Sequence, residues 1–339
     1  MAKWIPQWLH RLSSPPTFYR VAGAIRPWAL GAALLLGAVA FYGGLVLAPP
    51  DYQQHDAYRI IFIHVPSAWM SLFIYAAMGA AGFVALVWRL KLAEVACMAS
   101  ASIGAAFTFI TLCTGSLWGK PMWGTWWTWD ARLTSELVLL FLYLGVIGLY
   151  RAIEDPRQGA RAAALLALVG LINLPIVHFS VVWWNTLHQG STVRVLGPSK
   201  MPLAMLWPLL TAVLASKCYY LASLLGRMRT DLLALERGKG WVRALALGAP
   251  APAPVPLLES RMPAGARSMS GFWAMGGYAG YVWSAYALFL LVLLLDTLLP
   301  RWRQRRLLAE TRAQLLREQA RRQRGAASLP SGLDHESHP

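Results

Sequence analysis

The stretch from Trp118 to Glu136 concentrates side chains that can hold a large flat molecule. Five tryptophans fall within a dozen residues and an aspartate follows them directly: Trp118, Trp123, Trp126, Trp127, Trp129 and Asp130. Tryptophan also collects at the edges of membranes as an interfacial belt. Five rings in one connection exceed what such a belt needs, so their density favours a platform of indole faces against which a planar ligand stacks.

Two histidines lie at the edges of apolar runs on either side of this stretch. His64 stands in HVPSAW and His188 stands in WWNTLHQGST. Imidazole is a common ligand of haem iron, so we interpret the pair as axial ligands of a b-type haem. A lone histidine at a membrane edge is as often a hydrogen-bonded interfacial side chain, and only the combination with the tryptophans favours a ligand role. His178 is a weaker candidate inside an apolar run, and His55 is expected in a solvated loop.

The two propionates of haem call for nearby cations. Five positive residues are available on the same side of the predicted bundle: Arg59, Lys120, Arg132, Arg194 and Lys200. We assign Arg59 and Arg132 to the candidate site. Asp130 precedes an apolar run and is expected to cap the next helix with its carboxylate, so a role in ligand binding would be additional.

Long, nearly uncharged runs recur along the chain, which is 57% hydrophobic and 14% charged. About 20 apolar residues suffice to cross a bilayer as a helix, and backbone groups in lipid must be satisfied within the segment. We therefore predict an all-α polytopic membrane protein with a six-helix transmembrane bundle. The expected spans are 28–48, 60–88, 95–117, 131–150, 162–182 and 202–225.

The formal charge of +16 does not indicate a nucleic-acid partner. Nine arginines lie between Arg301 and Arg324 and others flank the apolar runs, as expected for contacts with anionic membrane lipid. Residues 1–27 lack the short apolar core of a cleavable signal peptide. The chain also contains no CxxCH and no GxxxxGK[ST] motif, so we expect neither c-type haem attachment to this chain nor nucleotide hydrolysis through a P-loop.

Lysine and arginine in the short loops predict the orientation. Fourteen of them lie in the loops on one side of the bundle and five in the loops on the other side. The richer side is cytoplasmic by the positive-inside bias, which predicts a bacterial inner-membrane protein. His64, the tryptophan stretch and His188 then all face the periplasm. Nothing about membrane-spanning helices requires these three features to share one side.

The chain continues beyond the six predicted spans. Residues 248–263 are rich in alanine and proline, which indicates a semi-rigid linker. A seventh apolar segment follows, and after it a basic amphipathic helix with paired leucines, which is expected on a membrane surface or against a partner. We therefore divide the chain into a six-helix domain 1–248, a linker 249–268 and a single-span segment with a basic tail 269–339.

The motif WGKPMWGTWWTWDARLTSE resembles the signature of the WWD-domain haem-handling family, and the segments FIHVPSAWMS and WWNTLHQGST are similar to those of its CcmC branch in cytochrome c maturation. The resemblance covers residues 1–248 through three separated motifs in one order. It implies six helices that hold haem at the periplasmic face between two histidines, here His64 and His188. It also implies delivery to the haem chaperone CcmE, the ABC transporter subunits CcmA and CcmB as partners, and no conventional enzyme activity.

The C-terminal sequence FWAMGGYAGYVWSAY and the basic helix after it resemble CcmD, the small single-span subunit of the same complex. The resemblance implies a cytoplasmic basic tail. A linker that starts in the cytoplasm after the sixth span, followed by one crossing, places that tail in the periplasm instead. Three resolutions stay open: a linker that is not simply cytoplasmic, an inverted last segment, or a joined chain that the cell does not make.

Two other functions also stay open. A b-type haem redox subunit that passes electrons to quinone belongs to an enzyme, but such subunits usually carry histidine pairs in both membrane halves, and only His178 is interior here. A permease subunit with a tryptophan gate needs intramembrane polar residues along a path, and these runs are poor in them. An optical spectrum of the purified protein separates the three functions.

Overall fold

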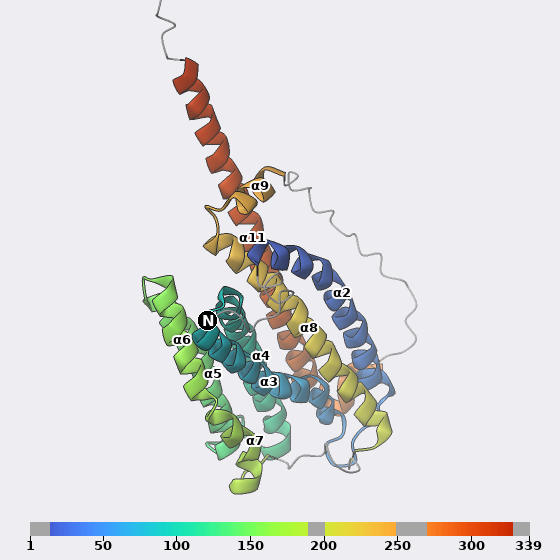
Figure 1. Ribbon diagram of the computed structural model, residues 1–339. Coiled ribbons are helices and arrows are strands. Elements are labelled where there is room, and N and C mark those ends of the chain that lie inside the picture. Colours follow the sequence, from blue (N-terminus) through green and yellow to red (C-terminus); the bar gives the residue numbers. More distant parts are fainter. Residues whose placement is uncertain (1–13, 189–200, 249–269, 328–339) are drawn as a thin grey trace, which may run out of the picture.

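The computed structural model describes residues 14–188, 201–248 and 270–327, which are helical almost throughout (Figure 1). Seven helical stretches are long and apolar enough to cross a membrane. Within the described residues, extended pairing is limited to an isolated bridge between Asp51 and His55. The prediction of an all-α polytopic membrane protein with a seventh C-terminal span is confirmed.

Helix α2 (Pro15–Tyr42) begins well before the expected start at residue 28. The Ser14 side chain caps it by accepting a hydrogen bond from the Thr17 amide, and prolines fill the first helical positions, where a missing N–H costs nothing. The helix continues into the π-helical turn η1 (Gly43–Leu47). The predicted start was wrong because the polar composition of the N-terminal region outweighed this capping signal.

The second span carries His64, and the third span carries the first half of the tryptophan motif. A short 3-10 helix, η2 (Asp56–Ile60), leads into α3 (Ile61–Trp88), close to its expected bounds. Helix α4 (Lys91–Trp123) packs beside α3 and extends past its expected end at Leu117. Gly124 ends α4 with a φ of 75°, in the left-handed region that favours glycine. Trp118 and Trp123 therefore lie on a helix and not in a loop.

The fourth and fifth spans differ in regularity. Helix α5 (Ala131–Ala152) starts at Asp130, whose Oδ1 accepts a hydrogen bond from the Leu133 amide at 2.8 Å, so the capping prediction is confirmed. The fifth span is broken into α6 (Pro156–Gly170) and α7 (Asn173–Trp183). The break precedes Pro175, which has no N–H to donate to the preceding turn.

The sixth span, α8 (Leu203–Leu235), also outruns its expected end, and α9 (Gly240–Gly248) follows it. The largest fully buried side chains lie between the central helices. The rings of Tyr75 and Tyr143 meet edge to face at 4.9 Å, and the Tyr143 hydroxyl donates to the Ser71 carbonyl at 2.8 Å. This core fixes α3, α4 and α5 relative to one another.

The C-terminal segment consists of α10 (Ser270–Ala274), η3 (Met275–Gly277) and α11 (Ala279–Ala327). The expected span and the expected basic helix are one continuous helix that passes through Pro300. It packs against α4 and α8. Its buried Asp296 forms an ion pair with Arg227 at 2.5 Å and accepts a 2.5 Å hydrogen bond from the Ser223 hydroxyl. This polar cluster fixes the register of α11 on α8.

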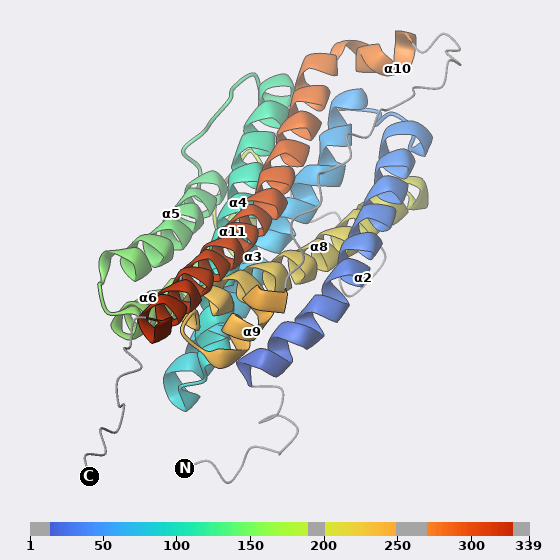
Figure 2. The same ribbon diagram turned by 90° about the horizontal axis from the view of Figure 1, so that it is seen from above.

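The bundle has two chemically different ends. We call the end with η1, η2 and the start of α5 the tryptophan end. We call the opposite end, with the start of α2, α9 and the C-terminal turns of α11, the basic end (Figure 2). At the tryptophan end, the Tyr286 hydroxyl of α11 donates to the Arg59 carbonyl at 3.0 Å. At the basic end, Glu310 of α11 pairs with Arg237 at 3.1 Å.

Helices α9 and α10 consequently lie at opposite ends of the bundle (Figures 1 and 2). The arginine-rich part of α11 shares the basic end with the loops that the lysine and arginine count assigns to the cytoplasm. The predicted linker falls within residues 249–269, outside the described residues, and joins these two ends.

Candidate functional site

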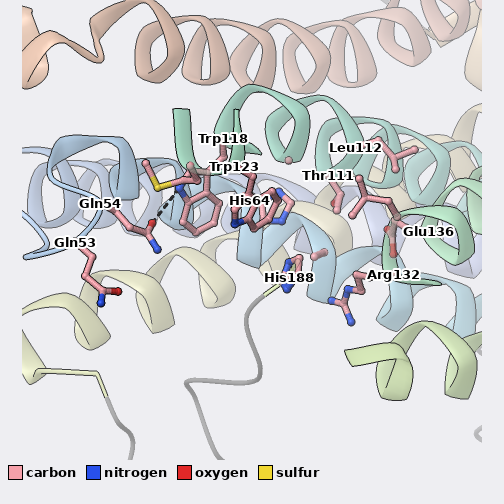
Figure 3. A pocket seen from close by; sticks show the side chains of 14 residues that line it. Gln53, Gln54, His64, Thr111, Leu112, Trp118, Trp123, Arg132, Glu136 and His188 are labelled. Carbon is pink, nitrogen blue, oxygen red and sulfur yellow. Dashed lines mark hydrogen bonds between the residues drawn. The ribbon is translucent and has the colours of Figure 1, made fainter. Parts of the chain in front are cut away.

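A cavity of about 240 Å³ lies at the tryptophan end, bordered by α3, α4 and α5 (Figure 3). Its lining brings together both candidate histidines, two of the five candidate tryptophans and one of the two candidate arginines: His64, His188, Trp118, Trp123 and Arg132. These residues come from separate parts of the chain, so the cavity forms only when the helices pack.

The buried imidazole of His64 is oriented by α4. Its Nδ1 lies 3.0 Å from the Thr114 hydroxyl oxygen. That hydroxyl donates its own hydrogen to the Ile110 carbonyl at 2.6 Å, so its oxygen accepts from Nδ1–H. The hydrogen bond selects the tautomer in which Nε2 carries a lone pair. A histidine held in this way is prepared to bind a metal through Nε2, because the second nitrogen fixes both tautomer and ring orientation.

The two histidines face each other across the cavity. Their ring centres are 6.4 Å apart and their planes are inclined by 33°. A metal ion held by two imidazoles at about 2 Å from each nitrogen requires ring centres roughly 6 Å apart. The separation in the folded chain therefore suits one metal ion between two imidazoles.

Trp118 and Trp123 lie beside this pair (Figure 3). The indole of Trp118 meets His64 edge to face at 5.7 Å, and its N–H donates to the Gln54 side-chain oxygen at 3.1 Å. The Trp123 ring is 6.3 Å from His188. One wall of the cavity is therefore aromatic and is held in position by a polar loop.

The other three tryptophans of the motif do not line the cavity. Trp126 contacts Tyr281 of α11 at a ring distance of 6.0 Å, and Trp127 packs against Trp129 at 5.5 Å. Trp129 is 78% exposed. The buried indole N–H of Trp127 and the second carboxylate oxygen of Asp130 have no hydrogen-bond partner among the described residues. This part of the motif forms a surface beside the cavity and not its wall.

Among the candidate cations, one lines the cavity and the other described ones do not. Arg132 lines the cavity and donates to the Val177 carbonyl at 2.8 Å. Arg59 lies outside the cavity lining, because its buried guanidinium is engaged by Asp56 at 2.8 Å and by the Gly44 carbonyl at 2.6 Å. Lys120 is half-buried and donates to the Gly124 carbonyl. The remaining candidates, Arg194 and Lys200, lie outside the described residues.

Several cavity residues were missed by sequence reasoning, above all Glu136. It lines the cavity, is 4% exposed, and accepts a hydrogen bond from the Ser71 hydroxyl at 2.7 Å. An ionisable residue inside an apolar span is a functional candidate by default, so the sequence did carry this signal. No comparable signal marks Gly115 in the sequence, because its importance is steric. A Cβ at this position would lie 3.0 Å from the His64 ring.

The weaker histidine candidates lie away from the cavity. His178 is exposed on α7 with its ring against Phe179 at 4.7 Å, so it does not point into the helix bundle. His55 is exposed in the loop before η2, as expected.

Comparison with known proteins identifies relatives of both parts of the chain. Residues 8–243 match the family model of Heme exporter protein C, and residues 276–324 match that of Heme exporter protein D (CcmD). Heme exporter protein C of Escherichia coli (strain K12) is 51% identical over 239 residues, which cover 70% of this chain and 96% of that protein. The Haemophilus influenzae protein is 47% identical over 240 residues, with 71% and 98% covered. The Bradyrhizobium diazoefficiens protein is 50% identical over 222 residues, with 66% and 84% covered.

Nearly the whole length of the first two relatives is therefore represented here, and the match includes every described residue of the cavity. The relatives' name supports a role in haem export for cytochrome c maturation. The chain belongs to the Heme exporter protein C (CcmC) family, and it carries a CcmD domain at its C-terminus.

Proposed function

We propose that this protein binds haem b at the periplasmic face of the bacterial inner membrane and delivers it to the haem chaperone CcmE. The observation that carries the proposal is the pair of opposed imidazoles, His64 and His188, with ring centres 6.4 Å apart beside two indoles. Haem is the cargo in this proposal, and its iron is bound by Nε2 of His64 on one side and by His188 on the other.

The remaining cavity residues have separate roles in holding the cargo. Trp118 and Trp123 contact the two histidines and supply flat apolar surface for the macrocycle. Arg132 supplies the positive charge for a propionate, since Arg59 is already paired with Asp56. The low polarity of the surrounding helices controls access of water to the iron.

The exposed part of the motif is suited to the recipient. Trp126 and Trp129 of the motif are half or more exposed. An exposed aromatic patch of this kind is typical of a protein-docking surface. We assign it to CcmE, which must come close to the histidines to receive haem.

The CcmD domain connects this surface to the transporter subunits CcmA and CcmB in our proposal. Its helix α11 touches the motif through Tyr281 and reaches the basic end, where it pairs with α8. A single continuous helix therefore links the tryptophan end to the basic end, which is predicted to face the ATP-hydrolysing subunits.

The test is the optical spectrum of purified single variants. His64→Ala and His188→Ala are each expected to lose the bis-imidazole, low-spin b-type spectrum and to stop loading CcmE. The matched control is His178→Ala, which removes an imidazole outside the cavity and is expected to retain both. An unchanged low-spin spectrum in both cavity variants would show that the ligand assignment is wrong. Reduction of the haem by added quinol with turnover would instead favour the redox-subunit function.

A further inference from the structure

A second cavity, of about 430 Å³, lies at the basic end of the bundle. Three arginines from three different helices line it: Arg26 of α2, Arg229 of α8 and Arg301 of α11. Leu30 and Leu34 of α2 complete one wall. The haem proposal uses none of these residues.

The three guanidinium groups are gathered without an acidic partner. In the described part of the chain, no ion pair includes any of them. The positive charges of Arg229 and Arg301 both repel the positive charge of Arg26. Arg26 donates only to the Ala222 carbonyl at 3.3 Å, and the buried Nε of Arg229 has no hydrogen-bond partner in the described residues. Such a cluster is suited to an anion that accepts several hydrogen bonds at once, and arginine matches phosphate best.

The position of the cluster is that of lipid headgroups. Arg26 directly precedes the first long apolar run, and Arg301 directly follows the last one. Arg229 lies in the final turns of α8, beyond its apolar part, with its guanidinium over the Tyr19 ring at 4.1 Å. The positive charge therefore stands where the hydrocarbon ends at the predicted cytoplasmic surface.

An apolar track leads from the arginines toward the membrane interior. Arg26, Leu30 and Leu34 follow one another at intervals of four residues, so they share one face of α2. Leu34 is 68% exposed, and nothing lies within 4 Å of the position that a Cβ on Gly31 takes. None of the described residues that line the cavity is aromatic, so the track is suited to a hydrocarbon chain and not to a porphyrin.

We propose that this cavity binds one anionic phospholipid, with its phosphate on Arg26, Arg229 and Arg301 and an acyl chain along Leu30 and Leu34. Basic pockets between transmembrane helices at the cytoplasmic side are typical sites for anionic headgroups. Arg301 belongs to the CcmD domain, whereas the other two arginines belong to the CcmC part. The lipid therefore joins the two parts, and the site is complete only when α11 is docked.

The experiment is native mass spectrometry of the full-length protein released from detergent after incubation with phosphatidylglycerol or with phosphatidylcholine. The wild-type protein is expected to retain phosphatidylglycerol in preference. Arg26→Gln and Arg301→Gln are each expected to weaken that retention about fivefold. Arg305→Gln is the matched control, because it removes an exposed cation from the same helix outside the cavity, and it is expected to retain lipid as the wild type does.

A third arm separates a lipid from a free anion. Inorganic phosphate in millimolar excess is expected to leave the bound phosphatidylglycerol in place, because phosphate has no acyl chain to occupy the apolar track. Displacement by phosphate, equal retention of the two lipids, or equal loss in the Arg305→Gln control would each overturn the proposal. Each variant is checked for a monodisperse elution profile and helical circular dichroism. If Arg26→Gln fails this check, Arg301→Gln alone decides.

Discussion

Replacing Thr114 by valine tests the histidine geometry most directly. Valine preserves the shape of the side chain and removes only the hydroxyl, whose oxygen lies 3.0 Å from Nδ1 of His64 at a fully buried position. The variant removes the Thr114 oxygen as acceptor of the buried Nδ1–H, at a cost of about 1–3 kcal/mol. His64 can avoid that cost by moving its proton to Nε2, which removes the lone pair that binds iron.

Both outcomes lower haem affinity. Loss of the hydrogen bond that orients a metal-binding histidine typically weakens metal binding about 10- to 100-fold, which corresponds to about 1.4–2.7 kcal/mol and agrees with the cost of the unpaired donor. The assay is titration of the purified protein with haem, followed by the intensity and position of the low-spin absorption bands. Thr114→Ser keeps the hydroxyl and is expected to restore most of the affinity.

The matched control lies on the same helix. The hydroxyl of Thr108 is equally buried and donates to the Gly104 carbonyl at 2.8 Å, but Thr108 does not line the cavity. Thr108→Val therefore measures the general effect of removing such a hydroxyl from α4 and is expected to bind haem normally. Wild-type affinity in Thr114→Val, or an equal loss in both valine variants, would refute the tautomer argument.

The remaining predictions concern the tryptophans and the C-terminal segment. Trp118→Ala and Trp123→Ala are expected to weaken haem retention by about 0.5–1.5 kcal/mol for each lost ring contact, measured as pyridine haemochrome content. Trp129→Ala is expected to retain haem and to reduce CcmE loading, measured as covalent haem on CcmE. Asp296→Ala removes the carboxylate that pairs with half-buried Arg227 and is expected to weaken the docking of α11 by about 1–3 kcal/mol. The loss is measured as a lower thermal unfolding temperature and faster proteolysis of α11. A cysteine at exposed Gln319 is expected to react with a membrane-impermeant maleimide only in opened vesicles or from the cytoplasmic side, and labelling from the periplasm would contradict the cytoplasmic tail.

Most of the fold could be predicted from the sequence, because apolar runs of membrane length carry a strong signal. The errors fell at helix ends. The start of α2 depends on the Ser14 cap, and the end of α4 depends on Gly124, and both signals are short and local. The break before Pro175 was hidden inside a run whose hydropathy is uninterrupted. Hydropathy detects burial in lipid, and it does not detect where backbone hydrogen bonds change partners.

The site was predictable as a set of residue types but not as an arrangement. One cavity brings together His64, His188, Trp118 and Trp123. Their predicted location on the same side of the membrane had indicated that they could meet. The neighbouring tryptophans separated from them because Gly124 turns the chain away after α4. Arg59 was assigned to the cavity because of its place in the sequence, and its pairing with Asp56 depends on the turn of η2. A linear motif does not show which of its residues share a face.

The structure also bears on how the two parts of the chain come together. Helices α9 and α10 lie at opposite ends of the bundle, and 21 residues connect the end of α9 to the start of α10. Fully extended, that many residues reach about 70 Å, more than the roughly 30 Å of bilayer hydrocarbon, so length alone permits the connection. The obstacle is chemical, because a proline-rich backbone cannot satisfy its carbonyl groups within a helix, and unsatisfied backbone is excluded from lipid. The packed state of α11 is held by contacts between the two parts, such as the ion pair between Asp296 and Arg227. We therefore expect a CcmD domain that is inserted as a separate chain to dock in the same way.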